Sequence, residues 1–172
     1  FHPEFAFLPR KFKIAVSALE EKDRAATAFH DIGVYIVRND AGEIGYKIMA
    51  GGGLGRTPII GSVIREFLPR EDLIAYLEAT LRVYNLHGRR DNKYKARIKI
   101  LVKALTPEVF AQKVEAEFEH TREALRIQPE ILKKLDEEFT PFDYQDLEDE
   151  DFTALFAENP KFKQWYNVNT NA

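Results

Sequence analysis

Lysine and arginine residues that could bind an anion are concentrated in three short segments of this chain. The first contains Lys11 and Lys13, which a predicted strand over 11–17 places on one face because side chains alternate in a strand. The intervening residues are apolar and are predicted to face the core: Phe12, Ile14 and Val16. Two like charges on one face repel each other unless water or an anion separates them. The lysine face is therefore either a solvated sheet surface or an anion site.

A glycine cluster follows another predicted strand, which ends at Ala50. Glycine has no side chain and tolerates positive φ, so its main-chain N–H groups can approach an anion closely. A cation and a hydroxyl follow the cluster three residues later. The predicted second anion-binding element comprises Gly51, Gly52, Gly53, Arg56 and Thr57.

The third segment runs from Gly88 to Lys99 and contains one carboxylate, Asp91, among many cations. Arginine and lysine at this density suit a ligand that carries several negative charges. Three such elements in one short chain favour an anion site over a solvated face.

In this order, and with roughly this spacing, the three segments resemble the sirohaem-dependent nitrite and sulfite reductases. The resemblance rests on Leu8-Pro9-Arg10-Lys11-Phe12-Lys13, on the triple glycine after a strand, and on an Arg-x-Asp-x-Lys run that ends in Ala96-Arg97-Ile98-Lys99. It covers about the first hundred residues. It implies that the chain is an internal fragment of such an enzyme, of the kind represented by the sulfite reductase haemoprotein beta component.

The resemblance also implies an activity and roles for individual residues. The activity is an assimilatory six-electron reduction of sulfite to sulfide or of nitrite to ammonia, at a sirohaem coupled to a 4Fe-4S cluster. Lys11 and Lys13 match the catalytic, substrate-side lysines of the family. The matching sirohaem-facing residues are Arg10, Gly51, Gly52, Gly53, Arg56, Thr57, Arg90, Lys95, Arg97 and Lys99. The basic motif reads as one residue longer than in the family, so either Lys95 or Arg97 is the pocket cation.

Cysteine is absent from the chain, and this limits what the chain can do alone. With 0 Cys it offers no thiolate to an iron-sulfur cluster, so the cluster ligands must lie outside it and the fragment is not expected to be active by itself. The electron donor implied by the family is a ferredoxin or a flavoprotein reductase, and the remaining parts of the same enzyme are further partners. No metal site is predicted, because the four histidines are scattered: His2, His30, His87 and His120.

The hydrophobic pattern predicts an α+β fold with a mixed or antiparallel sheet of three or more strands packed with helices. Strands are expected at 11–17 and 32–37 and before Ala50, the last two joined by a turn at Asn39–Gly42. A helix is predicted from about Glu71 to Gly88, and another from Pro107 to about Leu125 with Thr106 as its N-cap. Residues 96–103 fit either a helix or a strand.

The chain changes character after residue 127. We predict a sirohaem-binding domain over 1–127 and a helical, acidic linker over 128–172 that leads to the next ferredoxin-like half of the family. The acidic residues of the linker, which would form a solvated surface or dock a basic partner, are Asp143, Asp146, Glu148, Asp149, Glu150 and Asp151. Its aromatic side chains must pack on something: Phe152, Phe156, Phe162, Trp165 and Tyr166.

Overall composition excludes some other functions. The net charge of -3 and the pI near 5.9 argue against a nucleic-acid-binding protein, although the basic run with Tyr94 leaves a non-catalytic RNA- or anion-binding module as the alternative. Pro58 and two isoleucines follow the glycines where a dinucleotide-binding helix would begin, which argues against that motif. Without an apolar run of spanning length or a signal peptide, a cytoplasmic location is expected.

Overall fold

The computed structural model describes residues 2–143 and 151–170 and divides the chain into two compact units, Phe1–Glu138 and Phe139–Ala172. The first unit contains a four-stranded sheet in the order β1-β2-β3-β4, in which β1 is parallel to β2 and the other neighbours are antiparallel. The strands are β1 (Ile14–Ser17), β2 (Ile32–Arg38), β3 (Ile44–Ala50) and β4 (Ser62–Pro69). The predicted α+β fold is confirmed, and of the two sheet types left open, mixed or antiparallel, the sheet is mixed.

Local turn chemistry explains the central hairpin. Asn39 accepts a hydrogen bond from the amide of Gly42 at 2.9 Å and donates its own amide to Glu43 at 3.1 Å, and Gly42 has a φ of 80° that suits glycine. The predicted turn between β2 and β3 is therefore present. The fourth strand, β4, was not predicted, because irregularities in its pairing with β3 interrupt the simple alternation of side chains.

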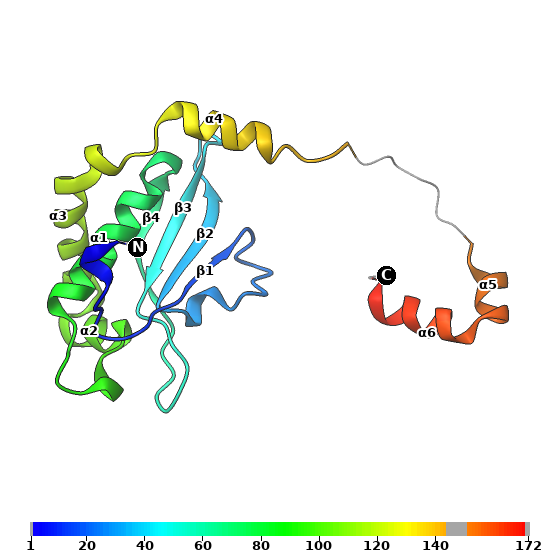
Figure 1. Ribbon diagram of the computed structural model, residues 1–172, viewed down its shortest axis with the longest axis horizontal. Coiled ribbons are helices and arrows are strands. Elements are labelled where there is room, and N and C mark those ends of the chain that lie inside the picture. The colour runs from blue at the N-terminus through cyan, green and yellow to red at the C-terminus, as the bar shows by residue number, and fades with distance from the viewer. Residues whose placement is uncertain (1, 144–150, 171–172) are drawn as a thin grey trace. The chain divides into compact units, whose positions relative to one another are not determined.

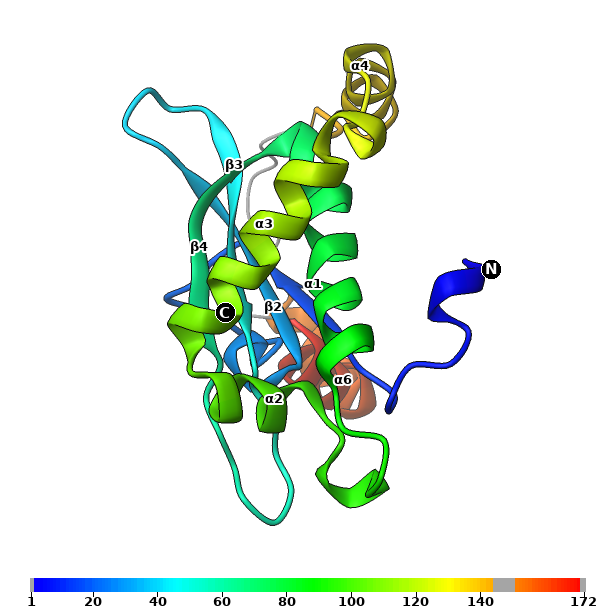
Figure 2. The same ribbon diagram turned by 90° about the vertical axis from the view of Figure 1, so that its left-hand side faces the viewer.

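Helices cover one face of the sheet, as Figures 1 and 2 show. The helices α1 (Leu73–His87) and α3 (Pro107–Leu125) lie side by side, and α2 (Ile98–Leu105) packs at one end of them. The largest fully buried side chains of this layer are Tyr76, Tyr84, Phe110 and Phe118. The rings of Tyr76 and Phe118 meet edge to face with centroids 5.1 Å apart.

The ambiguous segment 96–103 forms a helix over most of its length. Ile98, Leu101 and Val102 of α2 are buried on one side, so helical packing outweighs the strand preference of the β-branched residues. The N-cap predicted for α3 is also confirmed. The hydroxyl of Thr106 accepts a hydrogen bond from the amide of Val109 at 3.5 Å, and Pro107 occupies the first helical position.

The face predicted to be buried in the first strand was wrong for Ile14 and Val16, whereas Phe12, which precedes β1, is partly buried and packs against the core as predicted. Ala15 is buried, whereas Ile14 and Val16 are 40% and 55% exposed. Ala15 pairs with Gly33, and this side of both strands lies under the short 3-10 turn Thr27–Phe29, which approaches Gly33 closely. Because β1 is at the edge of the sheet, the covering element decides which side is buried, and only small residues fit beneath this turn.

Ion pairs fix the helices beyond the sheet. Asp72, fully buried at the start of α1, accepts two hydrogen bonds from Arg122 of α3 at 3.1 and 2.6 Å. Arg70 donates to Asp136 of α4 (Pro129–Glu138) at 3.1 and 2.6 Å, so α4 belongs to the first unit. The functional boundary predicted after residue 127 stays a prediction. No helix among the described residues is both long and apolar enough to cross a membrane.

Within its described residues, the second unit contains two short helices, α5 (Thr153–Glu158) and α6 (Pro160–Asn169). Five aromatic side chains of residues 151–170 pack on one another, with ring centroids 5.2 to 6.2 Å apart, in a cluster of Phe152, Phe156, Phe162, Trp165 and Tyr166. Four of the acidic residues predicted to form a solvated surface lie outside the described residues: Asp146, Glu148, Asp149 and Glu150.

Gly52→Ala tests whether the triple glycine is required by packing. A Cβ at Gly52 would lie 2.3 Å from the carbonyl oxygen of Ala28 and 2.5 Å from that of His30. We expect the variant to lose about 2 to 3 kcal/mol of unfolding free energy in urea denaturation, because backbone atoms cannot move aside cheaply. Gly42→Ala, in open space at positive φ, is the matched control and should cost about 1 kcal/mol. Equal losses in the two variants would contradict this explanation.

Candidate anion-binding site

A cavity of about 540 Å³ in the first unit brings together six of the residues singled out in the sequence. They are Arg10, Arg56, Thr57, Lys95, Arg97 and Lys99. The cavity is also lined by Leu54, Gly55, Tyr94 and Ile100, and no carboxylate lines it. We call it the cationic cavity. Segments that are far apart in the sequence, before β1, after β3 and before α2, thus supply one cation-rich surface.

Arg56 and Lys95 are the exposed cations of the cationic cavity. Within the described residues, no hydrogen bond or salt bridge engages either side chain. Arg10 is partly buried and donates a hydrogen bond to the carbonyl of Lys93, which ties the segment before β1 to the basic run. Charged side chains of this kind, held on a folded framework, suit a ligand with several separated negative charges.

Arg97 faces the cavity but is already paired within the protein. Its Nε and Nη2 atoms donate to the two carboxylate oxygens of Asp31 at 3.0 and 2.5 Å, and these hydrogen bonds raise the pKa of the guanidinium. The side chain of Asp31 is fully buried. The two residues predicted as alternative pocket cations therefore differ physically. Lys95 is exposed, whereas Arg97 neutralises a buried carboxylate.

Asp31 also holds the other two motif segments. Its Oδ2 accepts a hydrogen bond from the main-chain amide of Lys13 at 3.1 Å, and its carbonyl accepts one from Gly51 at 3.0 Å. One buried residue thus contacts the lysine segment, the glycine cluster and the basic run. Sequence reasoning missed Asp31, because a single aspartate before an apolar strand gives no signal of such a role.

Tyr84 makes a second connection between the motif segments. Its hydroxyl lies 2.8 Å from the carbonyl oxygen of Ala96 and 3.1 Å from that of Arg10. The side chain is fully buried, and burial raises its pKa, so the hydroxyl keeps its proton and remains a donor. In the sequence, Tyr84 lies within the helix predicted from about Glu71 to Gly88, and nothing there marks it as a link between these segments.

The remaining predicted site residues lie outside the cationic cavity. Lys11 and Lys13 are exposed and precede β1, and neither lines this cavity. Gly51 and Gly53 donate their amides within the protein, to Asp31 and to Ile59, the latter at 2.9 Å. Contact of these residues with a substrate or cofactor stays a prediction.

Arg90 also binds its own chain. It donates to the carbonyl of Phe7 at 2.7 Å and to the carbonyl and side-chain oxygens of Asn85 at 2.9 and 2.6 Å. These contacts hold the N-terminal segment against the end of α1. The place predicted for Arg90 at the cofactor stays a prediction.

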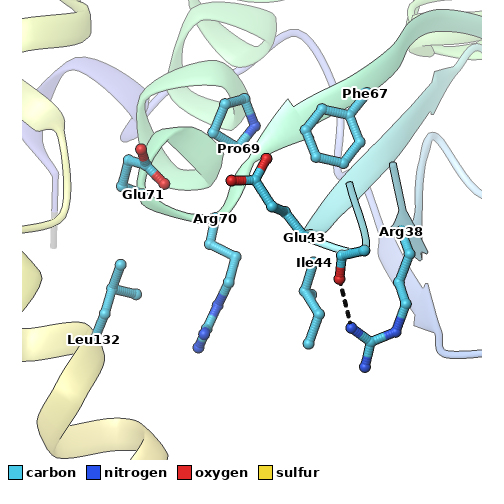
Figure 3. A pocket seen from close by; sticks show the side chains of 9 residues that line it. Arg38, Glu43, Ile44, Phe67, Pro69, Arg70, Glu71 and Leu132 are labelled. Atoms are coloured by element: carbon cyan, nitrogen blue, oxygen red, sulfur yellow. Dashed lines mark hydrogen bonds between the residues drawn. The ribbon is translucent and has the colours of Figure 1, made fainter. Parts of the chain in front are cut away.

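A second cavity, of about 480 Å³, lies between the β2–β3 hairpin and α4 and is shown in Figure 3. Arg38 and Arg70 line it together with Glu43 and Glu71, and the Arg38 guanidinium is bound to the Gly42 carbonyl at 2.8 Å. This cavity is therefore lined by charges of both signs, whereas the charged residues that line the cationic cavity are all basic.

Comparison with known proteins decides the family. A sequence profile described as "Nitrite and sulphite reductase 4Fe-4S domain" matches residues 1–122, well over half of the chain. The chain belongs to the nitrite and sulphite reductase family. The predicted resemblance is thereby confirmed. The match includes every lysine, glycine and arginine of the three motif segments.

Individual members of this reductase family are similar to the chain over about two thirds of its length. "Sulfite reductase [ferredoxin] 1" of Mycolicibacterium paratuberculosis is 31% identical, with 70% of this chain and 21% of that protein covered. The "Sulfite reductase [NADPH] hemoprotein beta-component" of Chromohalobacter salexigens is 36% identical, with 64% and 20% covered. The chain thus spans about a fifth of the length of these relatives.

A solved structure shares the fold. The structure of the Mycobacterium tuberculosis NirA protein superposes with a TM-score of 0.61 at 28% identity, covering 67% of this chain and 21% of that one. This chain, with 0 Cys, supplies no thiolate to the cluster after which the family profile is named.

Asp31→Asn tests whether the buried carboxylate holds the site together. We expect the variant to lose about 3 kcal/mol of unfolding free energy, because Arg97 is left without its countercharge. The natural control is Asp91→Asn, which breaks an exposed pair with Arg89 and should leave the urea midpoint unchanged. Equal midpoints for the two variants would show that Asp31 is not a structural anchor.

Proposed function

We propose that this chain forms the anion-binding part of a sirohaem-dependent sulfite or nitrite reductase. The observation that carries the proposal is the cationic cavity, in which five cations and no carboxylate line one surface. Sirohaem is a tetrapyrrole with carboxylates around its rim, so its pocket must supply several cationic donors. When bound, sirohaem would supply the iron at which electrons from a 4Fe-4S cluster reach the substrate.

Each group of residues has a distinct part in this proposal. Arg56 and Lys95 bind carboxylates of the tetrapyrrole, because they are the exposed cations of the cavity. Lys11 and Lys13 hold sulfite or nitrite by charge and donate protons as its oxygens leave as water. They can do so because both side chains are exposed and the Lys13 amide is fixed by Asp31.

The wider assembly follows from the same proposal. The cluster ligands lie outside this chain, so the chain does not reduce sulfite or nitrite by itself. Electrons come from a ferredoxin or a flavoprotein reductase; the name of the relative from Mycolicibacterium paratuberculosis includes ferredoxin, and that of the relative from Chromohalobacter salexigens includes NADPH. The proposed location is the cytoplasm.

Binding of uroporphyrin, a tetrapyrrole polycarboxylate without iron, tests the cavity directly. We expect absorbance titration of the chain to show saturable binding that weakens about ten-fold in each of Arg56→Gln and Lys95→Gln, because each loses a charge-assisted contact. Lys103→Gln, an exposed lysine of α2 outside the cationic cavity, is the matched control and should bind as the wild type does. Affinity that is the same in all four proteins would place the ligand elsewhere.

The same titration addresses the alternative function. A single-stranded RNA oligonucleotide at physiological salt is expected to bind weakly and to be displaced by added salt. If the chain binds RNA tightly and does not bind uroporphyrin, the reductase proposal is wrong and the chain is an RNA-binding module.

Lys11→Met and Lys13→Met test the catalytic lysines in the reductase that contains this chain. We expect turnover with sulfite or nitrite to fall by about one hundred-fold in each, since a proton donor and an anion-binding charge are lost together. The absorption spectrum of the bound haem should be unchanged. Wild-type turnover in both variants would show that these lysines form only a solvated surface.

A further inference from the structure

Residues 54–58 form an exposed loop that carries Arg56 to the cationic cavity. At its base Gly53 and Ile59 exchange two main-chain hydrogen bonds, each 2.9 Å long. Leu54, Gly55, Arg56, Thr57 and Pro58 are all exposed. A protruding loop of this kind needs a further contact to give Arg56 a defined position.

Lys99 provides that contact from the first turn of α2. Its ammonium donates to the carbonyl oxygens of Thr57 at 2.7 Å and of Leu54 at 3.2 Å, one on each side of Arg56. The residue is only 8% exposed, so its charge is largely withdrawn from water and compensated by these carbonyls. A bridge between the two carbonyls fixes the width of the turn at the point where Arg56 projects.

The glycine cluster makes room for this bridge. A Cβ at Gly53 would lie 3.1 Å from Cδ of Lys99, closer than most side-chain contacts. The lysine stem therefore crosses directly over the main chain of Gly53. This crossing gives the third glycine of the cluster a role that does not require its amide to meet an anion.

We propose that Lys99 is a positioning residue that holds Arg56 over the cationic cavity and does not itself bind the anion. The anion in this proposal rests on the proposed function. The contact between Lys99 and the loop, which we call the latch, rests on the geometry of the loop alone. Two of the three N–H donors of Lys99 are already engaged by the loop. An anion that drew the ammonium away would leave two carbonyls unpaired and release the loop.

The latch is tested first without any ligand. Lys99→Met keeps an apolar stem and removes the ammonium, so amide hydrogen exchange at Gly53 and Ile59, measured by NMR, should accelerate by about ten-fold. Lys103→Met on the same helix is the matched control and should exchange as the wild type does. Unchanged exchange at both amides in Lys99→Met would overturn the latch. If this variant fails to fold, Lys99→Gln, whose shorter side chain cannot bridge both carbonyls, takes its place.

A double-mutant cycle with uroporphyrin separates positioning from direct binding. If Lys99 acts through Arg56, Lys99→Met should weaken binding about ten-fold in the wild type and leave the affinity of Arg56→Gln unchanged. If Lys99 binds the anion itself, the two losses will add, and this outcome overturns the proposal. Failure of the wild type to bind uroporphyrin would reject the proposed function, while the exchange measurement still decides the latch.

Discussion

The buried carboxylate of Asp31 is the constraint on which the rest of the site depends. A charged group without water must be paired, and Asp31 meets this need with Arg97 and with the main-chain amide of Lys13. Its carbonyl binds Gly51 as well. Three segments that carry the basic and glycine-rich motifs are therefore joined at one point in the interior. The glycine-rich segment and the basic run also supply the exposed cations of the cationic cavity, Arg56 and Lys95.

The site uses its cations in two different ways. One group donates its hydrogen bonds to carbonyls or to a buried carboxylate of the protein and so stabilises the fold; it comprises Arg90, Arg97 and Lys99. Arg56 and Lys95 remain at the surface of the cationic cavity. A count of basic residues in the sequence overstates the hydrogen-bond donors that a ligand would meet, because many of these donors are already bound within the fold.

The structural features that could be predicted from the residues themselves are those that depend on residues close together in the sequence. The turn after Asn39 and the cap at Thr106 depend on neighbouring residues, and both are present. The gathering of Arg56, Lys95 and Arg97 in one cavity followed from a family resemblance, since no local rule joins them. The buried side of β1 depends on a turn that covers it, and the role of Asp31 depends on an arginine 66 positions away, so neither could be deduced from local pattern.

The contacts that define the cationic cavity all join distant parts of the chain, and this affects when it can form. Arg10 reaches Lys93 across 83 positions, and Lys99 reaches Thr57 across 42. Closing such long loops is slow compared with forming a helix or a hairpin. The cavity is complete only when α2, which carries Lys99 and Ile100, is in place. During synthesis, a chain that has not yet extended to Lys99 has the glycine loop but not the whole basic run and the α2 residues that complete the lining of the cationic cavity.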